Sequence, residues 1–272
     1  MSIYPKIVND SSYGRLYRLS SDIDHIVPSA STIPNYSLPT QPFLLKWKIE
    51  RSNGNWYNFL NLQSFESRLG AGVHDIAEKY LLGETVDLTS EDISDYINTK
   101  DIILPYDAVK QLRNGVLSVC SWCDENQPDV VVTEKLLYST EEGENGLKYP
   151  FCGRVDLVAS IDGELWLLDI KTSKQVKDVM SYQCQLSIYK MLWDAMHPSE
   201  PIDRIGVIHA NKTFRGSKPP MGTQKTVEYT FDEDLVWDCV KMFNRCYQGF
   251  DITGYKKKES SPLLLSRRSE NG

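Results

Sequence analysis

Residues 153–172, GRVDLVASIDGELWLLDIKT, contain two mainly apolar runs on either side of Asp162-Gly163. An Asp-Gly pair between two such runs is a strong hairpin signal, because a type I′ turn needs a positive φ at both central residues. A two-residue loop pairs Ile161 with Glu164, and the same register places Asp156 opposite Asp169. The segment therefore predicts a β-hairpin on which two carboxylates face each other.

The alternation of side chains along a strand places Lys171 on the same face as Asp169, with Arg154 opposite Lys171. The other face would carry the apolar residues Val155, Leu157, Leu168 and Ile170. Directly opposed carboxylates repel each other, so a cation is expected between them. Mg²⁺ takes one or two protein carboxylates beside substrate phosphates. The alternative is a surface hairpin whose solvent face happens to be charged.

The composition is that of a soluble protein, with 272 residues, 41% hydrophobic and 25% charged, and a net charge of −7. This charge argues against a basic nucleic-acid coat and favours an enzyme whose positive charge is local. No apolar run of about 18 residues and no hydrophobic leader occurs, so we expect a cytoplasmic protein without membrane contact, in a bacterium or a phage-infected cell. The six cysteines are sparse, and we expect them to be reduced.

Helical and extended patterns alternate on both sides of the hairpin. Helices are predicted over 60–82, 107–124, 178–196 and 232–247, and strands over 130–138, 204–211 and 226–231. Residues 1–27 read as a polar peripheral arm, and residues 249–272 as a flexible basic tail. One domain over 28–248 is therefore expected.

Two of the predicted helices carry residues suited to a site. His74 follows Gly70 and Gly72, and glycines inside a helix cost about 1 kcal/mol each relative to alanine, so they indicate close approach of a backbone or a ligand. The helix alone leaves His74 open as a structural residue or a ligand. Gln185 and Tyr189 lie four apart on one face of a later helix, as a core pair or as part of a site.

Together these residues resemble the core of the PD-(D/E)XK nuclease superfamily, and its RecB-like branch in particular. The matching motifs, in chain order, are His74, Gly153-x-x-Asp156, Asp169-Ile170-Lys171 and Gln185-x-x-x-Tyr189. The layout of residues 28–248 is most similar to the mitochondrial genome maintenance exonuclease and its phage and bacterial relatives. The resemblance implies an α/β fold with an αβββαβ core, in which helices flank a mixed central sheet.

The resemblance also implies a metal-dependent DNA exonuclease that holds one or two Mg²⁺ or Mn²⁺ ions. The implied ligands are His74, Asp156, Asp169 and the backbone carbonyl of Ile170. Lys171 would orient the attacking water or stabilise charge on the phosphate. Gln185 and Tyr189 would position the nucleic-acid backbone and support the site.

Two further features of the sequence stay open. Glu134, on the strand predicted before the hairpin, is either a supporting or second-metal acid or an exposed strand residue. Some RecB-like nucleases hold an iron–sulfur cluster on one early and three late cysteines. After the Gln-x-x-x-Tyr helix this sequence has two cysteines, Cys239 and Cys246, where the pattern needs three. The pair Cys120 and Cys123 does not complete it, so a cluster is not expected.

Single-stranded DNA ends are the expected substrate, with replication or recombination proteins as partners. The residues that could contact the strand, or else pack as helix residues, are Lys46, Trp47, Lys48, Arg51, Trp56 and Tyr57. One alternative is an endonuclease or the nuclease subunit of a recombination complex. An alternative from a different functional class is a catalytically silent DNA-binding module. The complete set of His74, Asp156, Asp169 and Lys171 argues against it.

Overall fold

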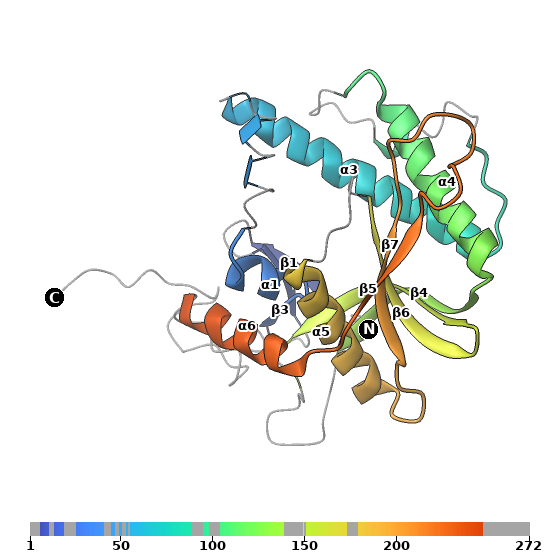
Figure 1. Ribbon diagram of the computed structural model, residues 1–272. Helices are drawn as coiled ribbons and strands as arrows, with labels where there is room; N and C mark the ends of the chain where they lie inside the picture. The colour runs from blue at the N-terminus through green and yellow to red at the C-terminus, as the bar shows by residue number, and fades with distance from the viewer. Residues whose placement is uncertain are drawn as a thin grey trace.

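The computed structural model describes residues 6–10, 14–18, 26–40, 45–46, 49–50, 53, 55–88, 95–97, 104–138, 149, 151–172 and 179–246. A five-stranded sheet lies between two layers of helices (Figure 1). Its strands are β4 (Asp129–Tyr138), β5 (Cys152–Ile161), β6 (Glu164–Lys171), β7 (Arg204–His209) and β8 (Lys225–Tyr229). One helical layer contains α3 (Trp56–Leu81) and α4 (Ala108–Asn126), and the other contains α1 (Thr32–Ser37), α5 (Met180–Met196) and α6 (Glu233–Cys246).

The sheet is mixed, with the strand order β4-β5-β6-β7-β8. Neighbouring strands are antiparallel except β6 and β7, which are parallel and are connected through α5. A parallel pair needs such a crossover, because the chain must return to the end of the sheet at which it started. The predicted αβββαβ core is confirmed.

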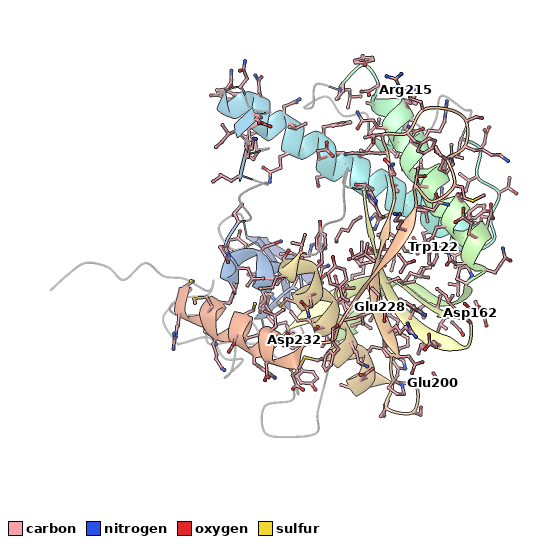
Figure 2. All side chains as sticks on the ribbon, in the orientation of Figure 1. Trp122, Asp162, Glu200, Arg215, Glu228 and Asp232 are labelled. Carbon is pink, nitrogen blue, oxygen red and sulfur yellow. The ribbon has the colours of Figure 1, made fainter. Side chains whose placement is uncertain are left out.

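The hairpin of β5 and β6 has the predicted register near its turn, but the ladder ends before the predicted pairs Asp156–Asp169 and Arg154–Lys171. Ile161 pairs with Glu164, and the ladder runs without a shift to Leu157 and Leu168. Asp162 and Gly163 have φ values of 53° and 84°, as a type I′ turn requires. Asp162 lies at the tip of this hairpin (Figure 2).

Each face of the sheet covers its own hydrophobic core. Leu157, Leu168 and Ile170 pack toward α3 and α4, as one face of the predicted hairpin. Val155 was expected with them, and this prediction is wrong: it packs with Val158 in the core on the α5 side. The alternation of side chains between the two faces of β5 is therefore broken between Val155 and Leu157. The neighbouring strand β4 has a residue with an unusual backbone, Glu134, at the same level.

Local signals account for the ends of the two long helices. The Asn55 side chain accepts hydrogen bonds from the backbone N–H groups of residues 57 and 58, so α3 begins four residues before the predicted start. Gly83 follows the end of α3 with a φ of 81°, the left-handed conformation expected there. α4 begins directly after Asp107, which is the predicted start, and ends two residues later than predicted.

The expected N-terminal arm contains a small antiparallel sheet of β1 (Lys6–Asp10), β2 (Gly14–Arg18) and β3 (Ile26–Pro28). Leu16 of β2 belongs to the main core on the α5 side. Ala30 donates a 2.8 Å backbone hydrogen bond to Cys152 of β5, which ties the small sheet to the large one. The tail predicted over 249–272 lies outside the described residues, as do Trp47, Lys48 and Arg51. Within the described ranges, every helix is too short or too polar to cross a membrane.

Candidate active site

The candidate site lies where the ladder between β5 and β6 ends. Beyond the last pair, Leu157 and Leu168, the Asp156 carboxylate takes the place of a backbone partner: its Oδ2 accepts a 2.7 Å hydrogen bond from the N–H of Ile170. This hydrogen bond holds the Asp156 carboxylate against the backbone of β6. The Ile170 carbonyl oxygen lies 3.0 Å from Nε2 of His74, the predicted site residue on α3.

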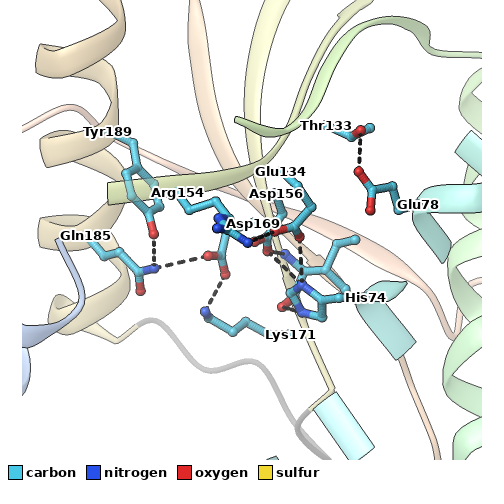
Figure 3. A network of polar contacts seen from close by, with 11 residues as sticks. His74, Glu78, Thr133, Glu134, Arg154, Asp156, Asp169, Lys171, Gln185 and Tyr189 are labelled. Atoms are coloured by element: carbon cyan, nitrogen blue, oxygen red, sulfur yellow. Dashed lines mark hydrogen bonds and ion pairs between the residues drawn. The ribbon is translucent and has the colours of Figure 1, made fainter. Parts of the chain in front are cut away.

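His74 brings two carboxylates together (Figure 3). Its Nδ1 lies 3.5 Å from Asp156 Oδ2 and 3.7 Å from Glu134 Oε1. The possible ligand atoms of His74, Glu134 and Asp156 all lie within 4.8 Å of one another. Glu134, which the sequence left open, therefore points into the site, and Arg154 Nη1 lies 3.7 Å from its second oxygen.

Glu134 has an unusual backbone for a strand residue, with a φ of 45°. Its neighbours Thr133 and Lys135 pair with Leu157 and Val155, so Glu134 stands opposite Asp156. A left-handed conformation in a non-glycine residue costs of order 1–3 kcal/mol and re-aims the side chain. This distortion brings the Glu134 carboxylate to His74. It lies opposite the point in β5 where side chains stop alternating between the two faces of the sheet.

Asp169 anchors a second set of contacts (Figure 3). The residue is 2% exposed, and its carboxyl group forms an ion pair with Lys171. Gln185 Nε2 donates to Asp169 Oδ1 at 3.1 Å and to the Tyr189 hydroxyl at 2.9 Å. The two sets of contacts meet on Asp169-Ile170-Lys171, so one short stretch of β6 connects residues from α3, β4, β5 and α5.

The close packing of charge shifts the pKa of each group. Burial, helped by the charge of Asp156, raises the pKa of Asp169 to about 6 against the opposing effect of Lys171. Burial alone would lower the pKa of His74, but the Asp156 and Glu134 carboxylates raise it well above its ordinary value. Without a metal ion, His74 and Lys171 thus balance the charge of Asp156 and Asp169, and Arg154 lies beside Glu134.

The other two shifts have the same origin. Burial would raise the pKa of Asp156, but His74, Lys171 and the Ile170 N–H outweigh burial and lower it. Burial would likewise lower the pKa of Lys171, and the Asp169 and Asp156 carboxylates raise it instead. Of the two aspartates, Asp156 therefore stays ionised to lower pH than Asp169, whose pKa is about 6.

A family model described as the PD-(D/E)XK nuclease superfamily matches residues 45–234, more than half of the chain. The chain belongs to this superfamily. The matched range contains every motif residue of the site, and membership indicates a metal-dependent nuclease. Oxygen donors from Asp156 and Glu134, with the Ile170 carbonyl beside His74, suit the hard divalent cations of such enzymes. The predicted ligand Asp169 is not part of this cluster and contacts Lys171 and Gln185 instead.

The other comparisons are distant. No curated protein gives a significant match. A solved structure described as "Crystal structure of SSO0001" covers 71% of this chain and 87% of its own chain, with 16% sequence identity and a TM-score of 0.32.

All the side chains predicted for the site of this superfamily member belong to the contact network of Figure 3. Ile170 takes part in it through its backbone N–H and carbonyl groups. Sequence reasoning missed Tyr182 of α5, whose ring centroid lies 5.3 Å from Lys171 Nζ. A signal for it existed, because Tyr182 precedes Gln185 by three residues and shares its face of the helix. It also missed the 2.8 Å hydrogen bond from Thr133 to Glu78, which ties β4 to α3 beside the site.

Gly153 owes its identity to close packing behind the site. A Cβ atom at this position would overlap the Tyr189 ring and lie 2.9 Å from Ala30 Cβ. Gly153→Ala is therefore expected to lower the free energy of unfolding by about 1–3 kcal/mol through overpacking. Urea unfolding measures this change.

Gly70→Ala is a matched control for that experiment. Among the residues that the structure describes, a Cβ at Gly70 would meet Thr172 Oγ1 alone, at 3.7 Å, so this change inside α3 should stabilise the protein by up to about 1 kcal/mol. Equal effects of the two substitutions would contradict the packing argument for Gly153.

Proposed function

We propose that this protein is a metal-dependent exonuclease that hydrolyses DNA from single-stranded ends, in replication, repair or recombination. The observation that supports this most is the convergence of His74, Glu134 and Asp156 beside the Asp169-Ile170-Lys171 strand end. Carboxylates, an imidazole, a carbonyl oxygen and one lysine at a single point make a site for a divalent cation and a phosphate.

Mg²⁺ or Mn²⁺, as one or two ions, is the proposed cofactor. The proposed ligands are His74, Asp156, Asp169 and the Ile170 carbonyl, with Glu134 as a supporting or second-ion ligand. A bound divalent cation would supply hydroxide near neutral pH and would polarise the scissile phosphate.

The side chains of this protein divide the remaining work. Lys171 is placed to orient the attacking water and to stabilise negative charge on the phosphate. Gln185 keeps Asp169 in one orientation and is itself held by Tyr189. Arg154, whose side chain is 45% exposed, is free to exchange its contact with Glu134 for one with the nucleic-acid backbone.

We further propose that the protein belongs to the RecB-like branch. The support comes from residues outside the Asp-x-Lys motif: His74 reaches the site from α3, and Gln185 and Tyr189 reach it from α5. The exposed side chain of Tyr57, near the start of α3, remains a proposed stacking platform for bases of the strand.

Cleavage of linear and circular single-stranded DNA tests the function. The wild type is incubated with each end-labelled or circular substrate in Mg²⁺, Mn²⁺ or EDTA. An exonuclease degrades only the linear strand, and EDTA abolishes this activity. Cutting of the circle would indicate an endonuclease instead, and absence of cleavage with every metal would contradict the enzymatic proposal.

The pKa shifts predict that metal affinity rises with pH. A cation must displace the proton of His74, whose pKa is raised well above its ordinary value, and below about pH 6 that of Asp169 as well. The apparent affinity for Mn²⁺ should therefore fall by about tenfold per unit from pH 8 to pH 6, and more steeply below. Calorimetry in buffers of different ionisation enthalpy measures the released proton.

His74→Gln is the informative variant in this titration. It removes one displaced proton, so its affinity for Mn²⁺ should be weaker at pH 8 but should depend less on pH. A wild-type affinity that stays constant between pH 6 and pH 8 would contradict the assignment of His74 as a ligand.

A further inference from the structure

Lys171 has a second partner besides Asp169. Its Nζ lies 5.3 Å from the ring centroid of Tyr182, in the first turn of α5. A lysine ammonium within about 6 Å of an aromatic ring centroid is attracted by the ring quadrupole. The ammonium group therefore contacts both a carboxylate and an aromatic ring.

The same face of α5 also holds Asp169. Tyr182, Gln185 and Tyr189 are spaced by three and four residues, so they lie along one side of the helix. Gln185 binds the Asp169 carboxylate, while Tyr182 contacts Lys171. One helix face thus contacts both charged residues of the Asp-x-Lys motif.

We propose that Tyr182 is a positioning residue whose ring holds the Lys171 ammonium at the site while Asp169 is engaged with a metal ion. This proposal rests on the proposed function. A carboxylate that ligates a cation binds a lysine more weakly, and the cation itself repels the ammonium group. An aromatic ring attracts Lys171 without a net charge, so it does not compete for the metal.

Kinetics of two variants test the role of the ring. Tyr182→Leu should lower kcat for DNA cleavage by about tenfold, with KM and the affinity for Mn²⁺ within about twofold of the wild type. Tyr182→Phe keeps the ring and should retain at least about half of kcat. A Phe variant as slow as the Leu variant would assign the effect to the hydroxyl group and overturn the proposal, as would full activity of the Leu variant.

A control for the loss of an aromatic ring is Phe231, which precedes α6 and contacts another lysine of α5. Lys190 Nζ lies 5.6 Å from the ring centroid of Phe231, outside the site. Phe231→Leu should leave kcat within about twofold of the wild type. A loss of kcat equal to that of Tyr182→Leu would show a general effect on α5 and would overturn the specific role of Tyr182.

Stability of the metal-free protein gives a readout that needs no cleavage. Tyr182→Leu should lower Tm more in the wild type than in the Lys171→Met background, because the second background already lacks the ammonium group. Equal shifts in both backgrounds would overturn the contact. If the wild type cleaves no DNA with any metal, the proposed function fails, and the cycle still decides whether Tyr182 and Lys171 are coupled.

Discussion

Asp169→Asn is expected to lower the rate of metal-dependent DNA cleavage by at least about a thousandfold. The Asp169 carboxyl group is almost fully buried between Lys171 and Gln185, so water is poorly placed to substitute for it. Asparagine keeps an oxygen that can accept the hydrogen bond from Gln185, but it carries no charge to hold a cation. Binding of Mn²⁺ should weaken together with activity, since both depend on the same carboxylate.

The control for this substitution is Asp203→Asn. Asp203 Oδ2 accepts a 2.8 Å hydrogen bond from Leu165 N, at the end of the hairpin away from the site. Cleavage by this variant should stay within about twofold of the wild type, because it alters a surface hydrogen bond only. Substantial cleavage by Asp169→Asn with unchanged Mn²⁺ affinity would contradict the ligand role of Asp169.

Lys171→Met is expected to separate chemistry from metal binding. The change should lower kcat by about 10²–10⁴-fold, because it removes the cationic side chain that pairs with Asp169. Affinity for Mn²⁺ should be unchanged or tighter, since the ammonium group that competes for the carboxylate is gone. Single-turnover cleavage and a Mn²⁺ titration of the same variant measure the two effects.

Lys190→Met is the matched control for Lys171→Met. Lys190 Nζ lies 2.8 Å from Asp194 Oδ2 on α5, four residues away along the helix and outside the site. This variant should cleave at the wild-type rate within about twofold. A Lys171→Met variant that keeps most of its kcat would show that the metal site activates water without the lysine.

Features that depend on neighbouring residues were predictable from the sequence. The Asp162-Gly163 turn set the register of β5 and β6, because both residues tolerate the positive φ that a tight hairpin needs. Gly83 marked the end of α3 for the same reason. Once the register is known, the alternation of β6 places Asp169 and Lys171 on one face. The motif spacing then identified the superfamily that the family model confirms.

Features that depend on contacts between distant segments were decided by the tertiary structure. Glu134 enters the site through a left-handed residue in β4, and the same irregularity accompanies the change of face that moves Val155 to the α5 side. Local propensity does not favour such a backbone, so it persists only because the surrounding contacts hold it. Tyr182 reaches Lys171 only because α5 folds back over the end of β6.

The division follows from the range of the forces involved. Turn geometry, helix caps and strand alternation act over a few residues, and the sequence therefore determined the hairpin and the faces on which Asp169 and Lys171 lie. The balance of charge around Asp156 and His74 sums contributions from α3, β4, β5 and β6, so it exists only in the folded chain. The sequence by itself predicted which residues form the candidate site; only packing decided which of them touch.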